Sequence, residues 1–384
     1  MINQVKMAFL IGAPRIKCCL LATVVFAVVV TPLYGDSAST KERTVTKIAD
    51  GIYEIRHADA PGNFPSGVQG NTTVIIGGKA VLVVDSGRLP STARQDIEQI
   101  KTWTNKPVTY LVNTHFHYDH TLGNEAYAAA FPAIQIVAQR QTQKLIGNDN
   151  PGQLARFVNK AAEMKKQLDS GKNPEGTPLT ASDRKKNEQT LADMEPVLEE
   201  IQGVSQLVPN VSFDTELDVD LGNRPVEIKF LGKGNTFGDT IVYLPKDKVL
   251  VAGDLVDHPV PYFFGFCFPV SLIQTLQKLA QLDAQVIVPG HGDVLHDKSY
   301  IAQMMDLATT VNTEVARLVN DGKTLEEIQP IVSKLPQLPE WRQKFAGDNP
   351  EDRTFFDQSF AALIKASQRE IYAGCIVTPE SCDE

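Results

Sequence analysis

Cysteine is scarce in this chain of 384 residues, which contains only five. Cys18 and Cys19 stand near the N-terminus, and Cys267 stands alone among aromatic residues, where we expect a buried thiol. No pair has the CxxC spacing, which argues against a cysteine-based structural zinc site. Cys375 and Cys382 are close enough in sequence to form a disulfide around a small loop if the chain reaches an oxidising compartment.

Long hydrophobic runs are also lacking, apart from the uncharged segment Cys18–Val30. Lys6, Arg15 and Lys17 precede this segment, and small or turn-forming residues follow it. This order is typical of a secretory signal peptide, which we place at residues 1–36. The segment is short for a membrane span of about 20 residues, and an uncleaved N-terminal anchor is the alternative. We therefore expect an exported protein, periplasmic or secreted, that is not embedded in a membrane after signal cleavage.

Basic residues are outnumbered, with 37 Lys and Arg against 46 Asp and Glu, so the formal net charge is −9. Removing residues 1–36 takes away three basic residues and one acidic residue, which changes the net charge to −11. An acidic surface disfavours nucleic acid and anionic membranes as partners. The partners that this composition leaves open include a small-molecule substrate. No internal repeat is visible.

Histidine is rare as well, yet three of the seven histidines lie within the stretch 113–120. This stretch follows Val108–Val112, whose β-branched and aromatic residues predict a buried strand. Residues two apart at the end of a strand point the same way, so His115 and His117 can converge on one point. Asp119 and His120 follow where the chain must turn, and they offer an oxygen and a nitrogen to a neighbouring point. So many nitrogen and oxygen donors predict a metal site.

Strand-like segments also precede this motif, beginning at about residue 43. Thr72–Ile76 and Ala80–Val84 flank a Gly-Gly-Lys turn and predict a hairpin. The second strand ends at Asp85, which could cap a turn or hold a ligand histidine from behind. A helix over Thr92–Trp103 then leads into the central strand. Strand, helix and strand at this spacing are typical of an α/β fold.

Two segments are helical in pattern. Residues 145–205 have apolar residues at helical spacing with Lys and Glu between them, and Gly and Pro interrupt the pattern midway. We interpret this segment as a helical hairpin inserted into the α/β domain, with Pro196 expected to interrupt or kink its second helix. Residues 298–384 are predicted to form a helical C-terminal extension.

Two further strands end in short glycine-containing motifs. The strand Val249–Ala252 leads into Gly253 and Asp254, and the strand Val286–Val288 leads into Pro-Gly-His291-Gly. Glycine after an apolar strand lets the backbone approach a ligand closely. Asp254 and His291 are therefore candidate ligands together with the histidine motif.

In their order and spacing, these motifs resemble those of the metallo-β-lactamase superfamily over roughly residues 43–295. The resemblance implies an α/β fold, an αββα sandwich at residues 43–297, that holds one or two metal ions between its two sheets. It implies a first metal site made of His115, His117 and a histidine in a later GHT-type loop. It implies a second site made of Asp119, His120 and His291, with Asp254 bridging both metals.

The sequence departs from this family at position 235. The family loop reads GHTxGD, and this chain has Asn235 where the histidine of the first site belongs. An amide oxygen is a poorer zinc donor than an imidazole nitrogen, so we expect a weak first site, a complete second site, and one or two zinc ions. The remaining histidines are His57, His258 and His296. Of these, His258 is the candidate substitute, although a solvent-facing role suits it better.

A metal-bound water has its pKa lowered to about 7, so hydroxide is available at neutral pH. We therefore predict a zinc-dependent hydrolase of an ester, thioester, lactone or amide-type bond. With only one metal, Asp119 or a nearby base would have to orient the water. At the position of Asp254, zinc β-lactamases generally carry Cys or Ser. An Asp at this position looks more like the glyoxalase II, lactonase and general hydrolase branches of the superfamily.

Other interpretations stay open at this point. Export suits a β-lactamase, which is the alternative activity. A metal-binding but non-catalytic protein is the alternative of another class, and the loss of a ligand at Asn235 supports it. The iron-dependent persulfide dioxygenases of this fold use the loop histidine that is missing here, so that activity is disfavoured. The aromatic run Tyr262-Phe263-Phe264 could line a substrate pocket or belong to the core.

Overall fold

A computed structural model describes residues 43–57, 69–148, 150–202, 204, 206–265 and 267–373. The expected signal peptide and the cysteine pair at positions 375 and 382 lie outside these residues. Cys267 is a free, buried thiol, as predicted. None of the helices in the described ranges is both long enough and apolar enough to cross a membrane.

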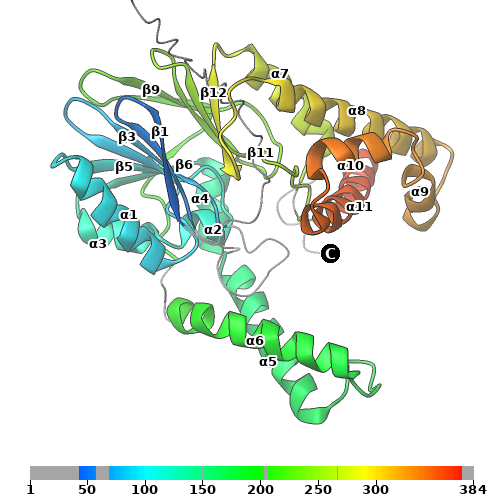
Figure 1. The fold of residues 1–384 in the computed structure, drawn as a ribbon. Helices are drawn as coiled ribbons and strands as arrows, with labels where there is room; N and C mark the ends of the chain where they lie inside the picture. Colours follow the sequence, from blue (N-terminus) through cyan, green and yellow to red (C-terminus); the bar gives the residue numbers. More distant parts are fainter. Residues whose placement is uncertain are drawn as a thin grey trace, which may run out of the picture. The chain divides into compact units, whose positions relative to one another are not determined.

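Two β-sheets form the centre of the fold (Figure 1). In the first sheet the strands lie in sequence order, antiparallel from β1 to β4 and parallel from β4 to β7. Its strands are β1 (Thr44–Ala49), β2 (Ile52–Arg56), β3 (Thr72–Ile76), β4 (Val81–Val84), β5 (Val108–Val112), β6 (Gln135–Gln139) and β7 (Val211–Phe213).

The second sheet has the order β12-β11-β10-β9-β8. Only the pair β11 and β12 is parallel. Its strands are β8 (Glu216–Asp220), β9 (Pro225–Phe230), β10 (Thr240–Leu244), β11 (Val249–Asp257) and β12 (Val286–His291). The strand β11 runs five residues beyond its predicted end, with an irregular register against β12, and therefore includes Asp254.

Side chains that alternate along a strand of the first sheet pack into two different cores. Ile75 and Leu82 pack between the two sheets, whereas their neighbours Val74 and Val83 pack on the opposite face of the first sheet. Both faces are covered, which explains why β4 consists of apolar residues without alternation.

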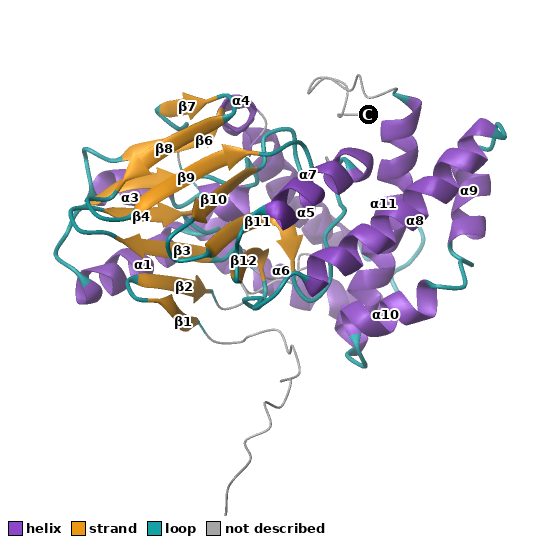
Figure 2. Ribbon diagram, turned by 90° about the horizontal axis from the view of Figure 1, so that it is seen from above, coloured by secondary structure: helices purple, strands orange, loops and turns teal. Residues whose placement is uncertain are grey.

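Helices cover the outer face of each sheet. The helices α1 (Pro90–Trp103) and α3 (Asn124–Ala130) pack on the first sheet, where Ile97, Ile100 and Tyr127 share one core with it. The helices α7 (Pro269–Gln281) and α8 (Ser299–Asn320) pack on the second sheet through Leu276 and Ile301. The predicted αββα sandwich is therefore confirmed (Figure 2).

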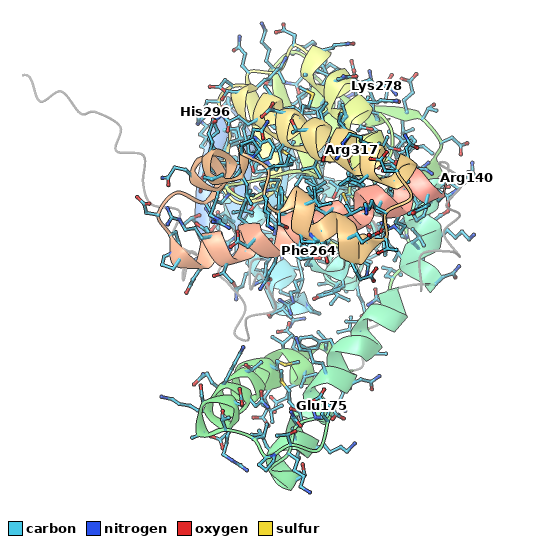
Figure 3. All side chains as sticks on the ribbon, turned by 90° about the vertical axis from the view of Figure 1, so that its right-hand side faces the viewer. Arg140, Glu175, Phe264, Lys278, His296 and Arg317 are labelled. Atoms are coloured by element: carbon cyan, nitrogen blue, oxygen red, sulfur yellow. The ribbon has the colours of Figure 1, made fainter. Side chains whose placement is uncertain are left out.

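The expected helical hairpin consists of α5 (Asn150–Ser170) and α6 (Ala181–Ile201). Its helices pack together through Phe157, Ala161, Met194 and Val197. Glu175 lies in the turn between them, at the end of the hairpin in Figure 3. The helix α6 is continuous, so the interruption expected at Pro196 is wrong. Two short helices, α2 (Tyr118–Thr121) and α4 (Arg140–Asn148), complete this half of the chain.

The C-terminal helices extend the core of the second sheet. Trp341, Phe345, Phe356 and Phe360 belong to the same apolar cluster as Leu250 and Ile287 of the sheet. Figure 2 shows these helices gathered beside α8. They are α9 (Leu325–Val332), α10 (Leu338–Ala346) and α11 (Pro350–Tyr372).

Glu54 of β2 gives the fold a testable pH dependence. Glu54 is 2% exposed, and burial raises the pKa of its carboxyl group from 4.5 to about 7. The folded chain therefore keeps a proton that the unfolded chain releases above pH 4.5. The stability that this proton provides is fully present below pH 4.5 and is lost as the pH rises through about 7, a fall of about 3 kcal/mol in the free energy of unfolding.

The variant Glu54→Gln stays neutral at every pH and should remove this fall. We expect its free energy of unfolding to equal that of the wild type at pH 4 and to exceed it by up to about 3 kcal/mol at pH 8. Urea unfolding at the two pH values measures the difference. An equal difference at both pH values would contradict the assignment.

Candidate metal centre

The histidine motif leaves the end of β5 and enters α2. His115 and His120 are fully buried, and their ring centroids are 4.3 Å apart. His115 Nε2 also lies 2.9 Å from His117 Nδ1. The turn after the strand thus brings three imidazoles together, as the spacing predicts.

Asp254 reaches this motif from the second sheet. Its Oδ2 lies 3.2 Å from His115 Nε2, and its Oδ1 lies 3.2 Å from His120 Nε2. One carboxylate therefore stands between two histidines of the opposite sheet. This is the position expected for a bridging ligand.

His291, the last residue of β12, joins the cluster from the second sheet. Its Nε2 lies 3.3 Å from Asp119 Oδ2, 3.2 Å from His120 Nε2 and 3.6 Å from Asp254 Oδ1. Asp119, His120 and His291 each offer one ligand atom within 4.8 Å of the others. These are the three residues predicted for the second metal site.

Two more groups meet the same distance criterion: His115 with His120 and Asp254, and Asp254 with Asp257 and His291. Asp257 is absent from the ligands predicted from the sequence. The only sequence signal for it is an acidic residue three positions after Asp254. Such residues are common on surfaces, and burial alone distinguishes this one.

The residues predicted for the first site are gathered less completely than those predicted for the second. His117 contacts His115 but belongs to none of the three groups found among the described residues. Asn235 is buried at the cluster, with its Nδ2 3.4 Å from Asp254 Oδ2. Its Oδ1 has no hydrogen-bond partner within the described ranges. An amide thus stands beside Asp254, where the family resemblance leads one to expect an imidazole.

The other three histidines lie outside the cluster. His57 Nε2 lies 2.7 Å from Asp96 Oδ2, and its Nδ1 lies 2.9 Å from the Gly70 carbonyl oxygen. His258 is 26% exposed, and its Nδ1 lies 3.6 Å from Asp293 Oδ2. His296 is exposed (Figure 3). No candidate metal group among the described residues includes His258, so this arrangement gives no support to His258 as the substitute ligand.

The charges of the cluster favour a cation. Burial opposes ionisation of Asp254, but His120, His115 and His291 outweigh it and hold the pKa of Asp254 well below its usual range. Burial likewise lowers the pKa of His291, but Asp254 and Asp119 outweigh it and raise that pKa to about 10. Protons on His120 and His291 thus balance the buried carboxylates, and a metal ion must displace them.

Several buried nitrogen and oxygen atoms of the cluster have no hydrogen-bond partner in the described part of the chain. They are Asp254 Oδ1, Asn235 Oδ1, His291 Nδ1 and both carboxylate oxygens of Asp257. Each such atom costs about 1–3 kcal/mol when it is left unpaired. Imidazole nitrogens and carboxylate oxygens are the donors that zinc and similar divalent ions take, so the residues fit a metal centre.

Asp85 holds one of the candidate ligands from behind. Its Oδ2 accepts a hydrogen bond from His120 Nδ1 at 2.9 Å and another from the Thr114 hydroxyl at 2.7 Å. Its Oδ1 accepts from the Thr114 backbone N–H at 2.8 Å. These bonds leave His120 Nε2 to face the cluster. Of the two roles considered for Asp85 from the sequence, this is the one observed.

Two glycines allow the close packing behind the ligands. A Cβ atom on Gly290 would lie 2.0 Å from Asp254 Oδ1, and one on Gly70 would lie 2.5 Å from His120 Cε1. Any side chain at either position would displace a candidate ligand. Gly290 therefore allows the backbone of β12 to pack directly against the side chain of Asp254.

Comparison with known proteins gives a family match over the same region. The model of the metallo-beta-lactamase superfamily matches residues 65–291. This range contains every candidate ligand.

Two curated proteins are similar in sequence. A linear primary-alkylsulfatase of a Pseudomonas species is 26% identical over 312 residues, which cover 77% of this chain and 54% of the alkylsulfatase. The chain thus spans about half the length of that relative. A type 2 metallo-beta-lactamase of Bacillus cereus is 24% identical over 249 residues, which cover 62% of this chain and 73% of the lactamase.

Among solved structures, the stereoselective inverting sec-alkylsulfatase of a Pseudomonas species superposes with a TM-score of 0.58 at 17% identity. The match covers 85% of this chain and 50% of that one. At this identity the likeness concerns the fold.

Because Asp85 contacts His120, we expect substitution of Asp85 to lower the affinity for metal. Asp85→Ala should weaken metal binding about 10- to 100-fold, because His120 loses the partner that orients it. Competition with a chromophoric chelator measures the affinity. Asp96→Ala is the matched control, because Asp96 holds His57 in the same way and His57 is not a candidate ligand. Equal losses in both variants would contradict a specific role of Asp85.

A second prediction concerns the metal content of a variant at position 235. Asn235→His should raise the metal content towards two ions per chain and tighten binding of the second ion, because an imidazole replaces a weak donor. His258→Ala should leave the stoichiometry unchanged. Zinc titration of metal-free wild type and both variants decides this. Two equally tight sites in all three proteins would show that Asn235 does not weaken the first site.

Proposed function

Because the chain belongs to the metallo-beta-lactamase superfamily, we propose that it is a metal-dependent hydrolase of a small-molecule substrate. The observation that carries this proposal is the position of Asp254 between His115 and His120, 3.2 Å from each. Donor atoms from both sheets meet there in a buried setting, and a fold alone does not require them. The hydrolase names of its relatives support the same reaction class.

The residues divide between two metal positions. His115, His117 and Asp254 would hold the first ion, and Asp119, His120 and His291 would hold the second, with Asp254 shared. We propose zinc as the metal, in one or two ions, with the second position the tighter. A divalent ion bound there lowers the pKa of a water to about 7 and polarises the bond to be cleaved.

A role for Asp119 in handling the proton of the attacking water is supported by its partial exposure. Its side chain is 22% exposed, whereas that of Asp254 is 3% exposed. It therefore reaches both the cluster and the solvent side. His291, 3.3 Å from its Oδ2, fixes the carboxylate in place. We propose that Asp119 orients the water and accepts its proton.

An aromatic group beside the cluster offers a surface for an apolar part of the substrate. Phe263 is buried in the core, but Tyr262 and Phe264 (the latter labelled in Figure 3) are partly exposed, with ring centroids 4.8 Å apart. Both rings pack against Phe355 of α11. Burial, then the carboxylates of Asp119 and Asp254, raise the pKa of Tyr262, so its phenol stays neutral and can donate a hydrogen bond.

The bond cleaved is proposed from residues and relatives together. Asp254 favours an ester, thioester, lactone or amide-type bond over a β-lactam. The alkylsulfatase, which has the longer of the two sequence alignments, adds sulfate esters to this group. A β-lactamase activity is the second candidate, supported by the Bacillus cereus relative and by the signal-like N-terminus. That N-terminus is also the reason to propose export to the periplasm or beyond.

A substrate panel tests the proposal. The purified protein, with its metal content measured, is assayed against a p-nitrophenyl ester, a thioester, a lactone, an alkyl sulfate and a chromogenic cephalosporin. We expect turnover in the ester group that chelation abolishes and zinc restores. His291→Ala should lose tight metal binding and turnover together, since it removes a ligand of the second site.

Three other outcomes would change the proposal. Turnover of the cephalosporin alone would favour the β-lactamase. Full metal content without turnover of any substrate would favour a metal-binding, non-catalytic protein. Stoichiometric metal in His291→Ala would contradict the ligand assignment.

A further inference from the structure

Asp257 is a buried acidic residue whose carboxyl group has no hydrogen-bond partner among the described residues. It is the last residue of β11 and pairs in register with His291 of β12. Asp257 is only 3% exposed to solvent. Neither of its carboxylate oxygens has a hydrogen-bond partner in the part of the chain that the structure describes.

Neighbouring acids differ from Asp257 in this respect. Asp85 accepts from Thr114 and His120, and Asp239 accepts from the Thr236 backbone N–H and hydroxyl at 2.9 and 2.7 Å. Asp293 forms ion pairs with Arg56 and His258. Each of these three carboxylates thus has a partner, whereas neither oxygen of Asp257 has one within the described ranges.

Asp257 lies close to two of the candidate metal ligands. One of its oxygens lies within 4.8 Å of a ligand atom of Asp254 and of His291. Two buried carboxylates at this distance repel each other, and an unpaired buried charge is costly. A cation between the groups satisfies all of them.

We propose that Asp257 is an additional ligand of the second metal position. The position then has Asp119, His120, His291 and Asp257, with Asp254 shared. This inference rests on the proposed metal centre and extends it. With three carboxylates and two imidazoles, the position has more than four donors and an oxygen-rich set. Such a set favours harder ions such as Mn²⁺ more than a histidine-rich tetrahedral set does.

Titration of metal-free protein with Zn²⁺ and with Mn²⁺ tests the assignment by calorimetry. In Asp257→Asn, the tighter binding step should weaken about tenfold or more for Mn²⁺ and by a smaller factor for Zn²⁺. Asn has the shape of a protonated Asp, so a carboxyl that stayed protonated would leave binding unchanged. Asp293→Asn is the control: it removes the same charge from an acid that is already paired, and it should bind both ions as the wild type does.

Thermal unfolding gives a second readout that does not depend on activity. In chelator, Asp257→Asn should melt no lower than the wild type, because the amide has the size of the carboxyl and carries no charge that burial opposes. With Mn²⁺ added, the rise in melting temperature should be smaller for the variant than for the wild type. If Asp257→Asn does not fold, Asp257→Ala takes its place in both experiments.

The outcomes separate this inference from the proposed function. Wild-type affinity for both ions in the Asp257 variants would overturn the ligand role and leave the metal centre standing. An equal loss in Asp293→Asn would also overturn it, because charge alone would then explain the effect. A wild-type protein that binds neither ion would overturn both proposals.

Discussion

The contact of Asp254 with His115 and His120 is the interaction on which the site depends. The histidines follow a strand of the first sheet, and the carboxylate belongs to a strand of the second, so the contact exists only when the two sheets pack face to face. Every other candidate ligand is placed relative to this contact. Gly290 lets the next strand approach Asp254, and Asp85 fixes the ring of His120.

The centre is costly to the fold without a bound cation. Buried carboxylates face each other and face imidazoles, and several of their atoms have no partner in the described ranges. The apolar cores on both sides of the sheets supply the stability that such an arrangement requires. The C-terminal helices contribute twice, because they extend one core and place Phe355 against the aromatic residues beside the site.

Much of this architecture could be predicted from the sequence. Apolar runs such as Val81–Val84 predicted strands of the first sheet to within a residue or two, whereas β11 and β12 run three to five residues beyond their predicted ends. The ends of the predicted strands identified the cluster residues. The strand Gln135–Gln139 was missed, because its polar ends hide a short apolar centre. Asp257 was missed because its burial comes from the pairing of β11 with β12, which lie far apart in sequence. No local pattern encodes such a contact.

Anomalous diffraction at the zinc edge, from crystals of the protein grown with zinc, tests the central claim most directly. The account predicts a strong peak among Asp119, His120, His291 and Asp254, and a weaker one or none beside His115, His117 and Asn235. A map with no peak at the cluster, or with a peak at another place only, would contradict it.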